Sequence, residues 1–166
     1  NGTHLQNPQR ITSCGENLVV MDFQDAHIAA FSSDLKPVWR YGGKGGGPLE
    51  LQSPGSVSCD DKHRIWVVDR GNGRVVILAP DGRQERLIST RQPIRRMSVG
   101  GAGEYWFGLT QSAPSEFMRV FSSNDASAIR TISAPESMNA LTPSQMEALL
   151  ARTAGGAVLV GFRWSS

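Results

Sequence analysis

The chain has 166 residues, a formal net charge of +2, and 39% hydrophobic and 19% charged residues. This composition is ordinary for a folded soluble protein, and the small charge gives no reason to expect a nucleic-acid or anionic-membrane partner. No apolar run approaches the length of a membrane span, and the 18 glycines and nine prolines are spread along the chain, which predicts many turns rather than disorder.

The first predicted elements are short strands separated by polar turns, and they occur in two aligned copies. The strands are expected at residues 19–22, 28–31 and 37–41 in the first copy, and at 66–69, 75–78 and 84–89 in the second. Without a gap, Asp22 aligns with Asp69 and His27 aligns with Arg74. The strands are rich in Val, Ile, Trp and Phe, and Gly, Asp, Asn or Pro separate them, which is typical of a β-meander.

A third copy is weaker, and a fourth copy only begins. The third copy has expected strands at 105–107, 117–121 and 128–132, and a strand at 157–162 starts the fourth. The corresponding units span about residues 8–52, 53–91, 92–133 and 155–166.

One helix is expected between the third and fourth copies, at about residues 142–152. Thr142 is a good N-cap, Pro143 occupies the first helical position, and Gln145 completes a capping box. We expect this helix to be an insertion that packs on the rim of the fold.

The length of each unit lies in the range of about 40–50 residues that is typical of propeller blades. A single meander leaves both of its faces open, whereas meanders stacked around an axis bury each face against a neighbour. The sequence therefore predicts an all-β fold, a β-propeller of four-stranded antiparallel meander blades. Three blades and part of a fourth would form a single partial domain over residues 1–166.

The second copy also resembles an NHL repeat. The resemblance rests on the glycine-rich segment 42–51 with the following Pro54, on segment 65–75, and on the closing Pro80-Asp81-Gly82. It implies a six-bladed propeller of the kind common in bacterial envelopes, and therefore an extracytoplasmic location. Six blades need about 250 residues. The chain is thus expected to be a fragment, or to complete a ring by self-association.

The turn between the middle strands of each copy holds candidate structural residues. In the second copy, Asp69 and Arg74 flank a tight turn that also contains Asn72, and their charged groups can close it with hydrogen bonds. In the first copy the same pair becomes Asp22 and His27, whose interaction would depend on pH.

The candidate ligand-binding residues are basic. Arg10, Arg95 and Arg96 follow prolines that lead into the first strands of their copies, where the chain would line the mouth of a central channel. Guanidinium groups there suit carboxylates or phosphates. Lys44 lies in the run Gly42–Gly47, which lacks the spacing of a phosphate-binding loop and is predicted to be a linker between blades.

The two cysteines, Cys14 and Cys59, are too few for a disulfide framework or a CxxC zinc site. We expect two small buried side chains, with a disulfide between them as the alternative. No cofactor is expected. The histidines form no spaced pair, although the resemblance to peptidyl-hydroxyglycine amidating lyases, which are NHL-type propellers holding zinc, leaves His27 and His63 as weak candidates for a zinc or calcium site.

Two functions follow as expectations. The first is a non-enzymatic module that binds a peptide, glycan or partner protein at the channel face. The second is a metal-dependent lyase or hydrolase on the same scaffold, and a purely structural fragment is a third possibility. The fold does not choose among them, because propellers host many functions.

Overall fold

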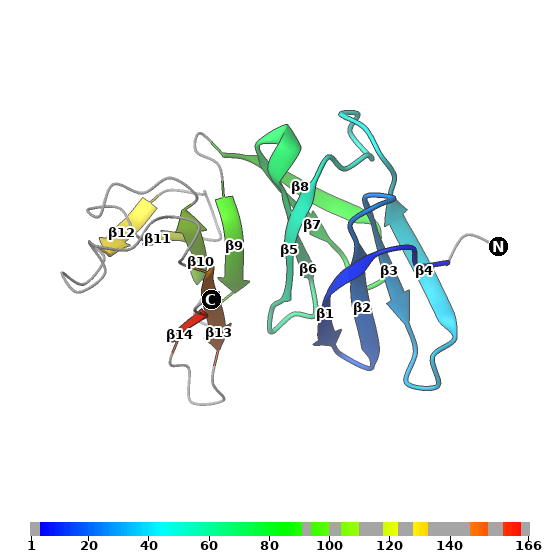
Figure 1. Ribbon diagram of the computed structural model, residues 1–166. Helices are drawn as coiled ribbons and strands as arrows, with labels where there is room; N and C mark the ends of the chain where they lie inside the picture. Colours follow the sequence, from blue (N-terminus) through cyan, green and yellow to red (C-terminus); the bar gives the residue numbers. More distant parts are fainter. Residues whose placement is uncertain are drawn as a thin grey trace. The chain divides into compact units, whose positions relative to one another are not determined.

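The computed structural model describes residues 4–90 together with the strands at 94–99, 104–109, 118–122, 128–132, 147–152 and 158–163 (Figure 1). The chain divides into two compact units, Asn1–Arg91 and Gln92–Ser166. Each unit is described by itself.

The first unit begins with a four-stranded antiparallel meander. Its strands are β1 (Pro8–Cys14), β2 (Asn17–Asp22), β3 (His27–Phe31) and β4 (Pro37–Gly42), and they are neighbours in the sheet in that order. Strands β2 and β3 pair from Leu18 opposite Phe31 to Asp22 opposite His27. Such a hairpin chain is what short apolar strands separated by turn residues form.

A second meander of the same kind follows. It consists of β5 (Pro54–Cys59), β6 (Ile65–Asp69), β7 (Arg74–Leu78) and β8 (Gln84–Ser89). The turn between β6 and β7 contains the short 3-10 helix η1 (Arg70–Asn72), which ends at Gly73 in the left-handed conformation (φ 60°). Glycine adopts this conformation without the steric cost that a side chain brings.

The two sheets of the first unit pack face to face, and their apolar side chains form one core. Val19, Met21 and Ile28 of the first sheet belong to the same buried cluster as Val67 and Val76 of the second. Strands β1 and β5 lie side by side where the sheets approach each other (Figure 1). This contact between meanders is the one that a propeller predicts, because each blade shields its neighbour's apolar face from water.

The second unit repeats the meander. Strands β9 (Ile94–Val99), β10 (Glu104–Leu109), β11 (Met118–Ser122) and β12 (Ala128–Ile132) form a four-stranded antiparallel sheet. Strands β13 (Glu147–Arg152) and β14 (Val158–Arg163) form a separate two-stranded sheet.

The expected helix at 142–152 is wrong for its second half, because Glu147–Arg152 is strand β13. The residues of the expected N-terminal cap, Thr142 to Gln145, lie outside the described part of the chain. Over the whole of its length β13 pairs with β14, from Glu147 opposite Arg163 to Arg152 opposite Val158. Helix propensity differs by only about 0.7 kcal/mol per residue among ordinary side chains, so a complete antiparallel ladder overrides it.

The all-β prediction is confirmed by these antiparallel meanders. Across the described residues, no helix has the length and apolar character needed to span a membrane. The prediction of a single domain over residues 1–166, with the blade boundaries given above, stays a prediction.

Candidate functional site

The first strand of each four-stranded sheet carries an irregularity at the same place. Its register with the second strand shifts between Pro8 and Arg10 in β1, between Pro54 and Ser56 in β5, and between Ile94 and Arg96 in β9. One residue of the first strand is therefore bulged out in each sheet. Bulges of this kind bend the strand and change the direction of side chains, and they are common near functional sites.

This shared register makes Arg10, Ser56 and Arg96 equivalent positions. Arg10 lies opposite Met21, and Arg96 lies opposite Gly108, directly after the bulge in each case. Both arginines are half-buried, and Arg10 donates from Nη1 to the carbonyl oxygen of Gln9 at 2.8 Å. The side chain of Arg95, which is the bulged residue of β9, lies outside the described part. That these arginines line the mouth of one channel stays a prediction.

The turn of the second sheet is closed by the buried carboxylate of Asp69. Arg74 donates from Nε to Asp69 Oδ2 at 2.7 Å, and Asn72 donates from Nδ2 to the same oxygen at 2.8 Å. Arg74 also donates from Nη2 to the carbonyl oxygens of Gly47 and Glu50, both at 2.7 Å. The turn therefore fastens the glycine-rich linker that precedes its own sheet.

The aligned turn of the first sheet is built differently. Asp22 is also fully buried, but its carboxylate accepts hydrogen bonds from the backbone N–H groups of Gln6, Asn7 and Asp25, at 2.6 to 3.1 Å. Burial raises the pKa of the Asp22 carboxyl, but these backbone hydrogen bonds and the nearby His27 ring hold it below its ordinary value.

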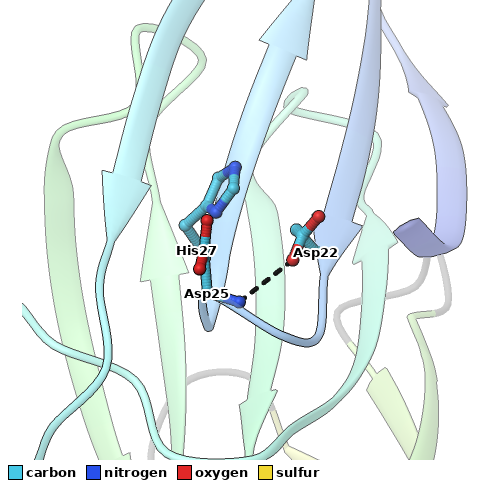
Figure 2. A group of neighbouring side chains, drawn as sticks. All are labelled: Asp22, Asp25 and His27. Atoms are coloured by element: carbon cyan, nitrogen blue, oxygen red, sulfur yellow. Dashed lines mark hydrogen bonds between the residues drawn. The ribbon is translucent and has the colours of Figure 1, made fainter. Parts of the chain in front are cut away.

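The expected hydrogen bond between Asp22 and His27 does not form. His27 is fully buried, and neither Nδ1 nor Nε2 of its ring has a hydrogen-bond partner within the described residues. Burial lowers the pKa of His27, and the positive charge of Arg40 lowers it further, although Asp22 and Asp25 act in the opposite direction. Together with Asp25, the pair forms a group whose potential metal-ligating atoms all lie within 4.8 Å of one another (Figure 2).

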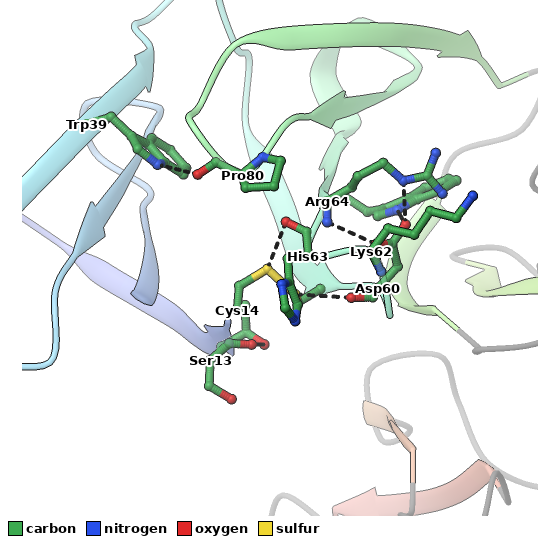
Figure 3. The surroundings of a disulfide bond; sticks show 11 residues. Ser13, Cys14, Trp39, Asp60, Lys62, His63, Arg64 and Pro80 are labelled. Carbon is green, nitrogen blue, oxygen red and sulfur yellow. Dashed lines mark hydrogen bonds and ion pairs between the residues drawn. A yellow bond between two sulfur atoms is a disulfide. The ribbon is translucent and has the colours of Figure 1, made fainter. Parts of the chain in front are cut away.

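The two cysteines are joined, so the expectation of separate thiols is wrong. Cys14 and Cys59 form a disulfide with a Cα–Cα distance of 5.5 Å (Figure 3). Each cysteine is the last residue of the first strand of its sheet, which brings both to the same end of the neighbouring sheets. The gap-free alignment that places Asp22 on Asp69 places Cys14 on Asp61, so it gave no signal for this pairing.

Two other sequence candidates lie apart from any group of ligands. Lys44 is exposed in the linker, where it makes an isolated bridge to Leu51. His63 is exposed in the turn between β5 and β6, and it belongs to no cluster of potential metal ligands among the described residues. Of the two weak histidine candidates, only His27 belongs to a cluster of three possible metal ligands among the described residues.

These repeated meanders, packed face to face with their first strands adjacent, define a β-propeller. No protein-family model matches the chain. Over 54 residues the chain is 40% identical to NHL repeat-containing protein 3 of Homo sapiens, a match that covers 32% of this chain and 16% of that protein. The sheets are therefore blades of a β-propeller, and the 54-residue match shows similarity to an NHL-repeat protein.

Solved structures share the fold at low sequence identity. A Bacteroides fragilis chain described as an exported protein superposes with a TM-score of 0.74 and 18% identity, over 99% of this chain and 53% of the other. A streptogramin B lyase superposes with a TM-score of 0.66 and 17% identity, over 93% of this chain and 48% of the other. A chain from a nidogen–laminin complex superposes with a TM-score of 0.62 and 17% identity, over 82% of this chain and 51% of the other. This chain thus spans about half the length of these structural relatives.

Proposed function

We propose that this β-propeller is a non-enzymatic recognition module that binds an anionic group on a peptide, glycan or protein ligand. The observation that carries the proposal is the equivalence of Arg10 and Arg96, each of which directly follows the bulge in the first strand of its sheet. Where blades repeat around an axis, equivalent positions face a common opening. Repeated guanidinium groups suit carboxylates and phosphates, which they bind through paired hydrogen bonds.

Two further findings support recognition outside the cytoplasm. The disulfide between Cys14 and Cys59 fits an oxidising compartment, where such bonds form and persist. The similarity to a chain of a nidogen–laminin complex indicates that a propeller of this fold can take part in binding another protein. The ligand class and the extracytoplasmic location are part of the proposal.

A metal-dependent lyase or hydrolase is the second candidate function. The similarity to streptogramin B lyase favours it, because a propeller of this fold is present in an enzyme. That similarity concerns the fold alone, and fold does not determine activity. A lyase would need both substrate-binding and catalytic side chains at one opening, whereas a recognition module needs only the basic side chains that bind the ligand.

The recognition proposal is tested with a fluorescently labelled polyglutamate peptide and fluorescence anisotropy. Replacing Arg10 or Arg96 by Ala is expected to weaken binding at least tenfold, since a charge-assisted hydrogen bond contributes about 1.5–3 kcal/mol and about 1.4 kcal/mol is tenfold. Each replacement should also reduce the salt dependence of binding. Arg83→Ala is the matched control, because it removes an exposed guanidinium from the turn between β7 and β8. Equal affinity in all three variants would contradict the proposal.

A further inference from the structure

The first and second blades differ in charge at three aligned positions of the same turn. The second blade has Asp69, Asn72 and Arg74 there, so the charges at these three positions sum to zero. The first blade has Asp22, Asp25 and a neutral His27, so its turn carries two negative charges. Arg40 of the neighbouring strand β4 is close enough to act on His27 and offsets part of that charge. The first blade therefore lacks the cation that closes the turn of the second.

His27 supplies an independent observation that points to a ligand. Its ring is completely buried, and both ring nitrogens are without hydrogen-bond partners among the described residues. Leaving a buried polar group unsatisfied costs about 1–3 kcal/mol. The ring nevertheless belongs to the same cluster as the Asp22 and Asp25 carboxylates, with ligand atoms within 4.8 Å (Figure 2). A species that accepts the lone pair of the imidazole would satisfy one of these two ring nitrogens and remove its part of the cost.

We propose that Asp22, Asp25 and His27 bind a divalent transition-metal ion of the Zn²⁺ class, which takes the place that the Arg74 guanidinium has in the second blade. One imidazole and two carboxylates form a mixed nitrogen and oxygen ligand set that suits zinc and similar ions. Ca²⁺ fits less well, because it takes six to eight oxygen ligands. Zinc binds such ligands at about 2.0–2.2 Å, so the ligand atoms, which lie within 4.8 Å of one another, have to move closer together around the ion.

The surroundings of the three side chains fit this assignment. Asp25 is half-buried, which leaves a path for the ion and for a water ligand in the remaining position. Gln6 donates from Nε2 to Asp25 Oδ2 at 2.9 Å and can orient that carboxylate, as second-layer hydrogen bonds do in metal sites. Asp22 Oδ2 accepts two backbone hydrogen bonds, from Gln6 and Asn7, whereas Oδ1 accepts one from Asp25 and keeps a second lone pair for the ion.

The ion would have a structural role in the first blade. It would join the turn between β2 and β3 to the chain segment at Gln6 and Asn7, whose backbone N–H groups bind Asp22. In the second blade, Arg74 makes the corresponding connection to the linker at Gly47 and Glu50. The assignment is independent of anion binding at Arg10 and Arg96.

The test begins with metal-free protein and uses Co²⁺ as a spectroscopic substitute for Zn²⁺. We expect saturable binding of one Co²⁺ per chain, with visible absorption bands of a four- or five-coordinate ion that Zn²⁺ displaces. Isothermal titration with Zn²⁺ should give the same stoichiometry. Bound Zn²⁺ at a hundredfold excess over its dissociation constant should also raise the free energy of unfolding, since binding to the native state alone stabilises it. Absence of saturable binding in the intact chain would overturn the assignment.

The second blade supplies the diagnostic variants. Asp25→Asn and His27→Arg each introduce the residue that the second blade has, and each is expected to weaken Zn²⁺ binding at least a hundredfold. The double variant has the side chains of the second blade at all three aligned positions, so it should fold without metal and show no change in unfolding midpoint with Zn²⁺. His63→Gln removes an exposed histidine and should bind Zn²⁺ as the parent does. Unchanged binding in His27→Arg, or equal loss in His63→Gln, would contradict the site.

A chelator separates this inference from the recognition proposal. Removing the ion should leave the affinity for polyglutamate unchanged while it lowers the unfolding midpoint of the parent chain. If polyglutamate binding requires Zn²⁺, the ion belongs to the ligand site and the structural assignment is wrong. If the protein binds Zn²⁺ at these residues but no polyglutamate, only the recognition proposal fails.

Discussion

At the scale of single residues, buried carboxylates organise the turns of this propeller. Asp60 is 8% exposed, and its two oxygens accept hydrogen bonds from the backbone N–H groups of Lys62 and Arg64, from Arg64 Nε and from Trp66 Nε1. The Arg64 guanidinium also lies 5.6 Å from the centre of the Trp66 ring. One carboxylate thus fixes the turn, a neighbouring cation and the largest fully buried side chain.

Asp60 is expected to make stability depend on acidic pH. Burial raises the pKa of its carboxyl, but the hydrogen bonds from Trp66 and Arg64 and the charge of Arg64 bring it below the ordinary value of 3.8. The unfolded chain then binds a proton more readily than the native chain. The contribution of Asp60 to stability is therefore complete above the unfolded pKa and is lost as the pH falls through the folded pKa.

Asp60→Asn is the variant that measures this contribution. An amide NH₂ in place of Oδ2 would face the N–H donors of Arg64 and Trp66, so we expect a loss of about 3 kcal/mol at pH 7. Urea denaturation at a series of pH values should show a smaller loss of stability between neutral and acidic pH than in the parent. Asp81→Asn, which changes an exposed turn carboxylate, should keep the parent's pH profile. If the stability of Asp60→Asn falls with pH in parallel with that of the parent, Asp60 is not the titrating group.

At the scale of elements, adjacent blades are joined by polar contacts as well as by their core. Trp39 of β4 donates from Nε1 to the carbonyl oxygen of Pro80 at 2.9 Å, and the Tyr41 hydroxyl lies 2.6 Å from Gln84 Oε1. At the other end of the sheet, the disulfide between Cys14 and Cys59 joins the first strands (Figure 3). Inner and outer strands of the two blades are thus both connected.

Removing the disulfide should weaken the first unit. The bond closes a loop with a sequence separation of 45, and the chain-entropy relation gives about 4 kcal/mol for a loop of that size. The double replacement of Cys14 and Cys59 by Ser is expected to lower the free energy of unfolding by up to that amount in urea titrations. Reduction of the parent with dithiothreitol should have the same effect, and the double variant should not respond to it. A parent that is insensitive to complete reduction would contradict this prediction.

The elements could be predicted from the sequence where a local pattern determined them. The paired strands around Asp22 and Asp69 were predicted because apolar runs and turn residues repeat in register, and they are confirmed in the two meanders. Strand β13 was missed because Glu147–Arg152 has good helix formers and an upstream capping pattern. Its pairing with β14 is a contact along a ladder, which residue propensities do not contain.

The candidate site, too, could be predicted from the sequence only in part. The sequence identified Asp22 and His27 as an aligned variant of the Asp69 and Arg74 pair. It did not predict that backbone N–H groups would satisfy Asp22, nor that the His27 ring would be left without a hydrogen bond. Asp25 was missed, although its alignment with the neutral Asn72 was a readable signal of excess negative charge. Burial and side-chain direction decided these points, and both depend on the packed fold.

At the scale of the whole molecule, the first strand of the first unit carries an exposed apolar side chain, Ile11. The register makes Ile11 equivalent to Val57, which is buried against the first blade, and Val20 equivalent to Val67. Yet Ile11 is 65% exposed, because the face that it shares with Val20 points away from the second blade. In a propeller this is the face that a further blade covers.

We expect this face to associate with another copy of the chain when no further blade covers it. Burying a side chain such as Ile11 contributes about 1.5–3 kcal/mol, so a lysine there should weaken association by tenfold or more. Sedimentation velocity over a concentration series should show association of the parent, and Ile11→Lys should shift the equilibrium toward monomer. Leu49→Lys is the matched control, because Leu49 is 64% exposed but lies in the linker between blades. A parent that stays monomeric throughout, or an equal shift in Leu49→Lys, would show that the exposed face of β1 is not the contact. Ring completion between copies would then be excluded for this surface.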